Sequence, residues 1–331
     1  MPYYLNNKHI NDYGLYPVRS ENSNVAIAGC WDMPARIGTA YHDWGDENGI
    51  EPYLEPGQIF FGGRTITLTV ALIAIDRIDA INKIMDMYKD IDAFTGLVTL
   101  ACDYGSFDVY VNDAIAINYV RQGKATAKLS FRQPVVSLSS PTQFIATETG
   151  GEFDTESGDQ ITNESSVIAL VGTGSLTGID GISFPALGIT PLSFTNSFNR
   201  PQPKPSFYKG YETEGFAISK RKERVGVLKC LIHKTNYTEF INVIQSLYNL
   251  FQQPNEHTLN YFNDKARSFF VKDGFTVTNF IVKPNFFIAL ININITETGK
   301  SVTQYIQNDA GQKINTDNDF TIFTDNVFID H

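Results

Sequence analysis

The sequence is poor in cysteine and has no long apolar run. Its three cysteines, Cys30, Cys102 and Cys230, lie far apart and form no CxxC pair, so neither a disulfide framework nor a zinc site is indicated. No stretch approaches the roughly 18 apolar residues of a membrane span. The first residues lack a basic region followed by an apolar run, so we expect no signal peptide. We expect reduced cysteines in a protein assembled in a cytoplasm.

Positive charge is also in short supply. The chain has 26 Lys and Arg against 36 Asp and Glu, a net charge of −10. A protein that grips nucleic acid needs Lys and Arg to displace counterions from phosphates. The balance therefore disfavours a nucleic-acid-binding protein, although it is compatible with a surface that DNA passes without being held.

What the chain has in abundance is aromatic residues, at 13% of 331 positions, while charged residues make up 19%. This mixture favours β-strands and buried association surfaces over long solvated helices. The length is sufficient for two domains, each with its own core.

A strand–helix–strand–strand pattern occupies the first half of the chain. Residues 64–72 alternate apolar and polar side chains, which predicts a strand with one buried face. Residues 76–88 have the period of an amphipathic helix, residues 97–101 and 106–111 predict a hairpin, and residues 124–131 predict a closing strand. The apolar stripe of the helix consists of Ile78, Ile81, Ile84, Met85 and Tyr88.

The same order returns in the second half. Residues 224–232 alternate, residues 237–251 predict a helix, residues 259–262 and 268–271 flank a turn, and residues 286–295 close the unit. The apolar stripe of this helix consists of Tyr237, Phe240, Ile241, Ile244, Leu247, Tyr248 and Phe251.

The two segments align without gaps through strand and helix at an offset of 160 residues. Few patterns exist for short elements, so apolar matches alone would be weak evidence. Polar matches between Asn82 and Asn242, and between Asp113 and Asp273, favour a duplication over chance. The other matches are Leu68 with Leu228, Leu72 with Ile232, Ile81 with Ile241, Ile84 with Ile244, and Tyr88 with Tyr248.

These patterns predict a mainly β (α+β) protein with two diverged β-sandwich or barrel domains, each with one crossing helix. We expect residues 1–140 to form the first domain with an N-terminal extension, and residues 206–299 to form the second. Residues 141–205 are expected to be an inserted β-rich and linker region that ends in the stiff, proline-rich stretch 201–205. Residues 300–331 are expected to form a C-terminal arm.

Two motifs could carry chemistry, and neither does so convincingly. Residues 42–47, His-Asp-Trp-Gly-Asp-Glu, contain metal-ligating types, but consecutive residues rarely converge on one point, which favours a hydrated loop. Residues 171–178 resemble a dinucleotide-binding loop, yet the glycines that follow and Pro185 prevent the helix that such a loop must open.

The remaining candidates also have structural interpretations. His233 follows a predicted strand, His257 lies in a predicted turn, and neither has a nucleophile arranged for a triad. The basic cluster at residues 220–224 favours a solvated loop over a phosphate site. We therefore predict no catalytic, metal or cofactor-binding residue, and no enzyme.

The order of elements resembles the tube-forming domain of tailed-phage distal tail and baseplate hub proteins. The resemblance rests on the strand 65–72, the helix 76–88, the hairpin around residues 103–105 and the closing strand 129–134. It is a pattern of elements without a signature motif. It implies a small β-sandwich or barrel crossed by one helix, with copies joined in a ring around a channel, and it carries no catalytic residues.

The resemblance implies a structural role in the virion tail, assembled in the host cytoplasm. Two domains per chain would allow a trimer with pseudo-sixfold symmetry, or a hexamer in which the first domain lines the channel. Partners would be other copies and other tail proteins (tube, hub or fibre), with DNA only in transit and no membrane.

Two alternatives stay open. One is a carbohydrate-binding or adhesin-type module, suggested by the aromatic residues Trp31, Tyr41, Trp44 and Tyr53. The other is a hydrolase of unrecognised type, which would require a deep pocket with converging carboxylates.

Overall fold

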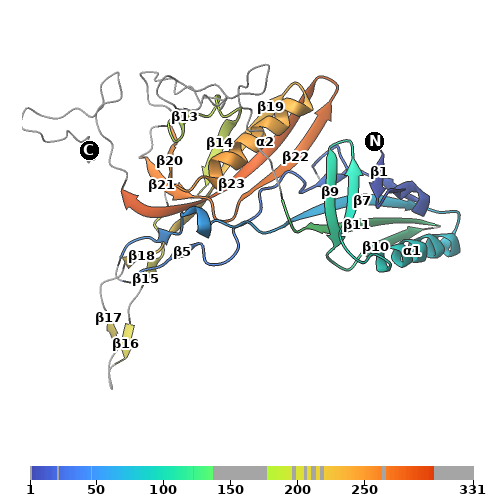
Figure 1. Cartoon of the computed structure of the whole chain (residues 1–331), viewed down its shortest axis with the longest axis horizontal. Helices are drawn as coiled ribbons and strands as arrows, with labels where there is room; N and C mark the ends of the chain where they lie inside the picture. The colour runs from blue at the N-terminus through green and yellow to red at the C-terminus, as the bar shows by residue number, and fades with distance from the viewer. Residues whose placement is uncertain are drawn as a thin grey trace, which may run out of the picture.

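The structure is a computed structural model that describes residues 2–20, 22–45, 47–121, 123–136, 177–195, 199–204, 207–209, 214–216, 220–262 and 266–301. It is mainly β, as the sequence predicts. Two curled antiparallel sheets each carry one long helix on one face (Figure 1). No helix in these ranges has both the length and the apolar character needed to cross a membrane.

The first sheet has the strand order β2-β1-β8-β9-β11-β7-β3, with β4 also on β7 and β10 on β11. Its longest pair, β7 and β11, runs from Arg64 opposite Gln133 to Ile73 opposite Lys124. Alternate side chains of both strands are buried, which is the expected period. The strands are β1 (Tyr3–Leu5), β2 (Lys8–His9), β3 (Leu15–Pro17), β4 (Ile27–Ala28), β7 (Arg64–Ile73), β8 (Val98–Cys102), β9 (Gly105–Val111), β10 (Ala116–Arg121) and β11 (Lys124–Gln133).

The second sheet has the order β13-β12-β20-β21-β23-β19-β14, with β22 on β23. Its strands are β12 (Gly178–Ile179), β13 (Ile182–Ser183), β14 (Thr190–Thr195), β19 (Arg224–Lys234), β20 (His257–Asn260), β21 (Arg267–Phe270), β22 (Phe275–Lys283) and β23 (Phe286–Ser301). Smaller elements are η1 (Ile10–Tyr13), β5 (Tyr41–His42), β6 (Glu51–Pro52), η2 (Pro56–Gln58), β15 (Pro203–Lys204), β16 (Phe207–Lys209), β17 (Glu214–Phe216) and β18 (Lys220–Arg221).

The two sheets have the same strand order, position by position. Even the irregularities correspond, because β10 and β22 each carry a bulge at the same place against their partner strands. Ile117 of β10 and Val277 of β22, 160 residues apart, hold the same place in the two pairings. Such agreement supports a duplicated unit, since two unrelated strand arrangements have no reason to share both order and register.

The helices begin with the same local chemistry. In α1 (Arg77–Asp92) the Asp76 side chain accepts a hydrogen bond from the Asp79 N–H at 2.8 Å. In α2 (Tyr237–Gln252) the Asn236 side chain accepts from the Glu239 N–H at 2.9 Å. Both are N-cap bonds to an acidic third residue, and both pairs lie 160 residues apart.

The helices differ in how they are buried. In α1, Ala80 and Met87 are buried and the neighbouring Ile84 and Tyr88 pack against the core. The rest of the expected apolar stripe faces outward: Ile78, Ile81 and Met85 are 70%, 49% and 58% exposed. In α2 the buried residues are Phe240, Val243, Ile244, Leu247, Tyr248, Leu250 and Phe251.

The second domain begins earlier in the chain than expected. Residues 178–195, assigned above to the inserted region 141–205, form β12, β13 and β14 and pair into the second sheet. Short strands with glycine between them gave no strong periodicity, which concealed their place in the unit. Residues 137–176 and the predicted arm beyond residue 301 lie outside the described ranges.

Equivalent core positions should have equivalent energetic weight. Leu68 and Leu228 are both 0% exposed, so Leu68→Ala and Leu228→Ala should each lower the free energy of unfolding by ~2–5 kcal/mol through lost burial and a residual cavity. Urea unfolding followed by circular dichroism measures both. The matched control is Ile78→Ala, at a 70% exposed position, which should change the free energy by less than ~0.5 kcal/mol. A negligible loss at either leucine would contradict the equivalence.

Candidate functional site at the joint between the domains

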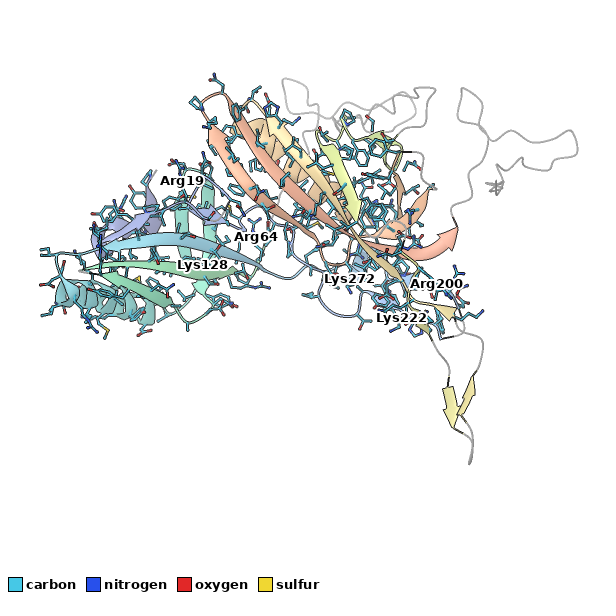
Figure 2. All side chains as sticks on the ribbon, turned by 180° about the vertical axis from the view of Figure 1, so that it is seen from behind. Arg19, Arg64, Lys128, Arg200, Lys222 and Lys272 are labelled. Carbon is cyan, nitrogen blue, oxygen red and sulfur yellow. The ribbon has the colours of Figure 1, made fainter. Side chains whose placement is uncertain are left out.

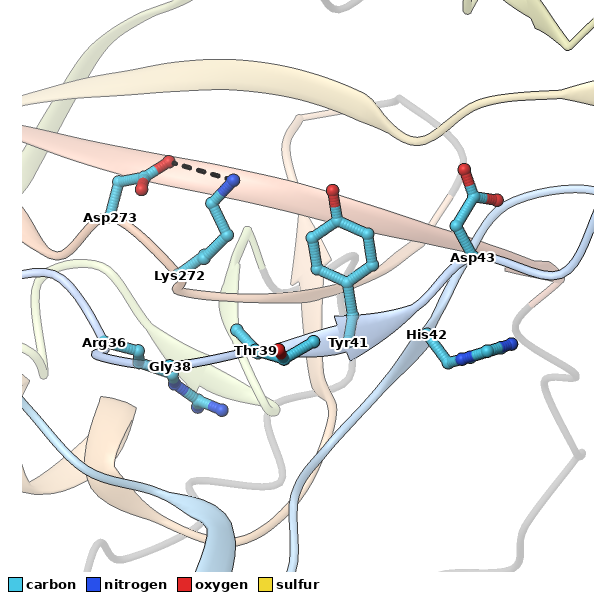
Figure 3. Close-up of a pocket in the computed structure, with 9 residues that line it drawn as sticks. Arg36, Gly38, Thr39, Tyr41, His42, Asp43, Lys272 and Asp273 are labelled. Carbon is cyan, nitrogen blue, oxygen red and sulfur yellow. Dashed lines mark ion pairs between the residues drawn. The ribbon is translucent and has the colours of Figure 1, made fainter.

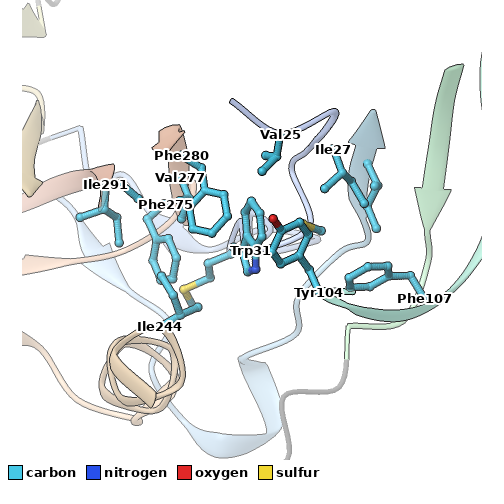
Figure 4. Packing of buried hydrophobic residues seen from close by; sticks show 14 of the residues in the cluster. Val25, Ile27, Trp31, Tyr104, Phe107, Ile244, Phe275, Val277, Phe280 and Ile291 are labelled. Carbon is cyan, nitrogen blue, oxygen red and sulfur yellow. The ribbon is translucent and has the colours of Figure 1, made fainter. Parts of the chain in front are cut away.

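The segment between β4 and β7 leaves the first sheet and carries Trp31 into the joint between the domains. Trp31 is 3% exposed, and its ring centroid lies 4.1 Å from that of Phe280 on β22 and 5.8 Å from that of Phe240 on α2. Figure 4 shows Trp31 between the side chains of the first domain and those of the second. One tryptophan thus joins the two cores, which form a single cluster of buried apolar residues.

The turn between β8 and β9 also meets the second domain. Tyr237, the first residue of α2, donates a hydrogen bond from its hydroxyl to the Tyr104 carbonyl at 2.6 Å and accepts one from the Trp31 indole at 3.2 Å. Burial raises the pKa of Tyr104 to about 12 and raises that of Tyr237 as well. Both hydroxyls therefore stay protonated, and that of Tyr237 is the donor in this bond.

Residues 23–33 lie along the outer edge of β22 and satisfy its backbone groups. The Val277 N–H donates to the Asp32 carboxylate at 2.7 Å. Further along, the Asn24 side chain accepts from the Val282 N–H at 2.8 Å and donates to the Val282 carbonyl at 2.6 Å. An edge strand is a template for pairing with another chain, and in the second domain the first domain covers it.

Buried charge accompanies this contact. Arg64, at the start of β7, is 7% exposed and lies at the joint in Figure 2. Its guanidinium donates to the Gln133 side chain at 2.8 Å and to the Asp32 carbonyl at 3.4 Å. Burial raises the pKa of the Asp32 carboxyl to about 6, although the Val277 N–H and the charge of Arg64 oppose the shift. Burial also raises the pKa of the Cys30 thiol.

A second contact between the domains centres on Lys204 of β15. Its ammonium donates to the carbonyls of Gly49 at 2.6 Å, Trp44 at 3.1 Å and Glu47 at 3.3 Å, and it pairs with the Asp43 carboxylate. The proline-rich stretch was expected to be a linker. Its residues Pro203 and Lys204 instead pair with β18, and Lys204 holds the loop 43–49.

The loop 42–47 was considered as a metal site and interpreted as a hydrated loop. His42 is exposed and lies against Trp44, with ring centroids 4.0 Å apart, and the Trp44 indole donates to Glu51 at 2.7 Å. In the described part of the chain, no three His, Cys, Asp or Glu side chains gather where they could hold a metal ion. This loop serves the contact with Lys204.

An open hollow of about 390 Å³ lies beside this loop. Its carboxylates, Asp43 and Asp273, lie at opposite ends in Figure 3. Each is paired with a lysine, Asp43 with Lys204 and Asp273 with Lys272, the latter at 3.8 Å. The hollow therefore lacks the converging carboxylates that the hydrolase alternative requires. Its lining consists of Arg36, Gly38, Thr39, Ala40, Tyr41, His42, Asp43, Lys272 and Asp273.

The two histidines considered as chemical groups lie apart from this hollow. His233 is exposed near the end of β19, beside the ring of Phe286. His257 does not lie in a turn as expected: it begins β20, is fully buried, and its Nδ1 lies 2.6 Å from the Asp180 carboxylate. This contact joins β20 to the turn between β12 and β13, which gives His257 a structural role.

The remaining candidate motifs have ordinary structural places. Of the basic cluster 220–224, Lys220 and Arg221 form β18, while Arg224 pairs with Glu297 at 3.5 Å. The glycine-rich stretch 171–178 lies outside the described ranges up to residue 176, and Gly178 belongs to β12.

The aromatic residues that suggested a carbohydrate-binding face do not share one. Trp31 is buried in the joint, and Tyr41 and Tyr53 are partly buried. Trp44 is 45% exposed. A sugar-binding platform needs several exposed rings on one face, so the motive for this alternative is removed.

Sequence reasoning did not single out Asn24, Asp32 or Lys204. Asp32 follows Trp31 in the aromatic stretch, and a carboxylate beside a tryptophan is a usable signal of a buried hydrogen bond. Asn24 and Lys204 give no such signal, because their partners lie 258 and 155 residues away in the chain.

Comparison with protein-family models, with curated proteins and with solved structures gives no match for this chain.

The raised pKa of Asp32 predicts a pH dependence of the joint. The folded protein favours the protonated carboxyl, because its pKa of about 6 exceeds the ordinary value of ~3.9. This contribution to stability is present below pH ~4 and is lost as the pH rises through 6. Asp32→Asn keeps the acceptor for the Val277 N–H, so the free energy of unfolding of the variant relative to the native protein should rise by ~1–3 kcal/mol between pH 4 and pH 8.

Trp31 fluorescence during urea unfolding, in a Trp44→Phe background that leaves one tryptophan, measures this difference at the joint itself. A difference that stays constant with pH would show that Asp32 does not titrate in this range.

Proposed function

We propose that this chain is a structural component of a phage tail tip, of the distal tail or baseplate hub type, and that its sheets form the wall of a ring around a channel. The repeated strand order carries the proposal. A unit that recurs within one chain and docks on its own copy has the surfaces needed to recur around a closed ring.

Two domains per chain would give six wall units from a trimer with pseudo-sixfold symmetry. A hexamer in which the first domain alone lines the channel is the other arrangement. The difference between the helices, with α1 exposed and α2 covered, fits a ring in which alternate units have different surroundings.

The sheet face opposite the helix suits a wall that DNA passes. On β7 it presents Thr65, Thr67 and Thr69, and on β11 it presents Thr126 and the exposed Lys128, which is labelled in Figure 2. Hydroxyl groups hold the phosphate backbone weakly, because tight binding needs many neutralised phosphates. DNA would contact this face only in transit.

A platform for other tail proteins would come from the hairpin of β16 and β17. It projects away from both sheets in Figure 1. An element that extends from the body of a ring can reach a tube, hub or fibre protein. In this proposal the chain assembles in the host cytoplasm and is carried in the virion tail.

Mass photometry and negative-stain electron microscopy of the purified chain test the proposal. The 37.0-kDa chain should form a species of about 111 kDa (trimer) or about 222 kDa (hexamer), with a central opening in the images. A monomer that persists at high concentration would contradict it.

A further inference from the structure

An apolar stripe of α1 faces away from the core of the first domain. Ile78, Ile81 and Met85 fall on one side of the helix and are 70%, 49% and 58% exposed. Three large apolar side chains at this spacing normally pack against a neighbour. The stripe therefore needs a partner that the described part of this chain does not supply.

The strand beside this stripe has a free edge. Arg77 lies over the ring of Tyr119 at 5.8 Å, and the Tyr88 hydroxyl donates to the Ile115 carbonyl at 3.4 Å, so α1 lies over β10. One edge of β10 pairs with β11, and no described strand pairs with the other. We call the stripe Ile78, Ile81 and Met85 together with this edge the α1–β10 face.

The corresponding face of the second domain is covered from within the chain. There Val277, the counterpart of Ile117, donates its N–H to Asp32, and the Met33 N–H donates to the Phe275 carbonyl at 2.9 Å. Trp31 packs on the start of α2 and on Phe280. The segment that follows β4 of the first domain therefore docks on α2 and β22 of the second.

The segment that follows β14 of the second domain stands in the same relation to its own sheet. Ala28, at the end of β4, pairs opposite Thr67, and Thr195, at the end of β14, pairs opposite Val227. Thr67 and Val227 are 160 residues apart, so the two strand ends are equivalent. Three residues further on, the sequence reads Trp-Asp-Met-Pro at 31–34 and Phe-Asn-Arg-Pro at 198–201.

We propose that the α1–β10 face binds the second domain of another copy of this chain, in the manner in which α2 and β22 bind the first domain within one chain. The proposal builds on the ring suggested above and names the surface that closes it. Such a head-to-tail contact is heterologous: one end of each copy fits the other end of the next, and repetition produces a closed ring when the rotation allows it.

The chain itself provides the reason for choosing a second copy as the occupant. A partner for the second domain's face already exists as a surface of the first domain, and the second domain carries its equivalent. An unrelated partner would have to reproduce that complement by chance. The competing occupants are residues 137–176 and 302–331 of the same chain, and they are outcomes of the test.

The first experiment places charge on the face. The double variant Ile78→Glu with Met85→Glu should weaken self-association in analytical ultracentrifugation by at least about tenfold, because two carboxylates would be desolvated at an apolar contact. The matched control is Thr238→Glu with Gln245→Glu, at the same helix positions of α2, which should associate as the unaltered chain does. Equal association of both variants would overturn the proposal.

The second experiment identifies the occupant. A photoreactive benzoylphenylalanine at position 81 should form a crosslinked dimer of about 74 kDa, twice the 37.0-kDa chain, whose joined peptide comes from the second domain. A crosslink within one chain, to residues 137–176 or 302–331, would assign the face to the chain itself and overturn the proposal. A failure to crosslink would do the same.

These results separate the face from the ring. Rings that persist in the α1 double variant would leave the proposed function standing and refute this face as the contact. Monomers of the unaltered chain at every concentration, without a crosslink, would refute both.

Discussion

The arrangement of the whole molecule depends on the covering of one strand edge. β22 exposes the backbone groups of Val277 and Val282, and segment 23–33 of the other domain supplies their partners through Asp32 and Asn24. Trp31 seals the same contact with apolar surface. A curled sheet that stops short of closing leaves such an edge, so each unit needs a neighbour. The second domain has its neighbour within the chain, whereas the first presents the α1–β10 face.

Much of this fold could be predicted from periodicity. The long strands β7, β11, β19 and β23 and both helices appear within a few residues of their expected bounds, because each has one face on the core and a clear period. The 160-residue offset identified the repeat for the same reason. The absence of strong motifs also left the joint unmarked.

Other features depend on tertiary context that no local pattern contains. Strand β10 was not predicted, and β12 and β13 are too short to show a period. The outward turn of Ile78, Ile81 and Met85 could not be foreseen, since an amphipathic stripe indicates a contact without naming the surface that supplies it. The contacts of Asp32 and Lys204 join residues more than 150 positions apart.

The central claim is that β10 and β22 have equivalent edges, one covered within the chain and one covered by another copy. Hydrogen–deuterium exchange of the peptides that contain Ile117 and Val277 tests it directly. The account predicts that the Val277 amide is protected at every protein concentration, because it donates to Asp32, whereas the Ile117 amide exchanges quickly in dilute protein and becomes protected as the chain associates. Protection at Ile117 that does not change with concentration would contradict it.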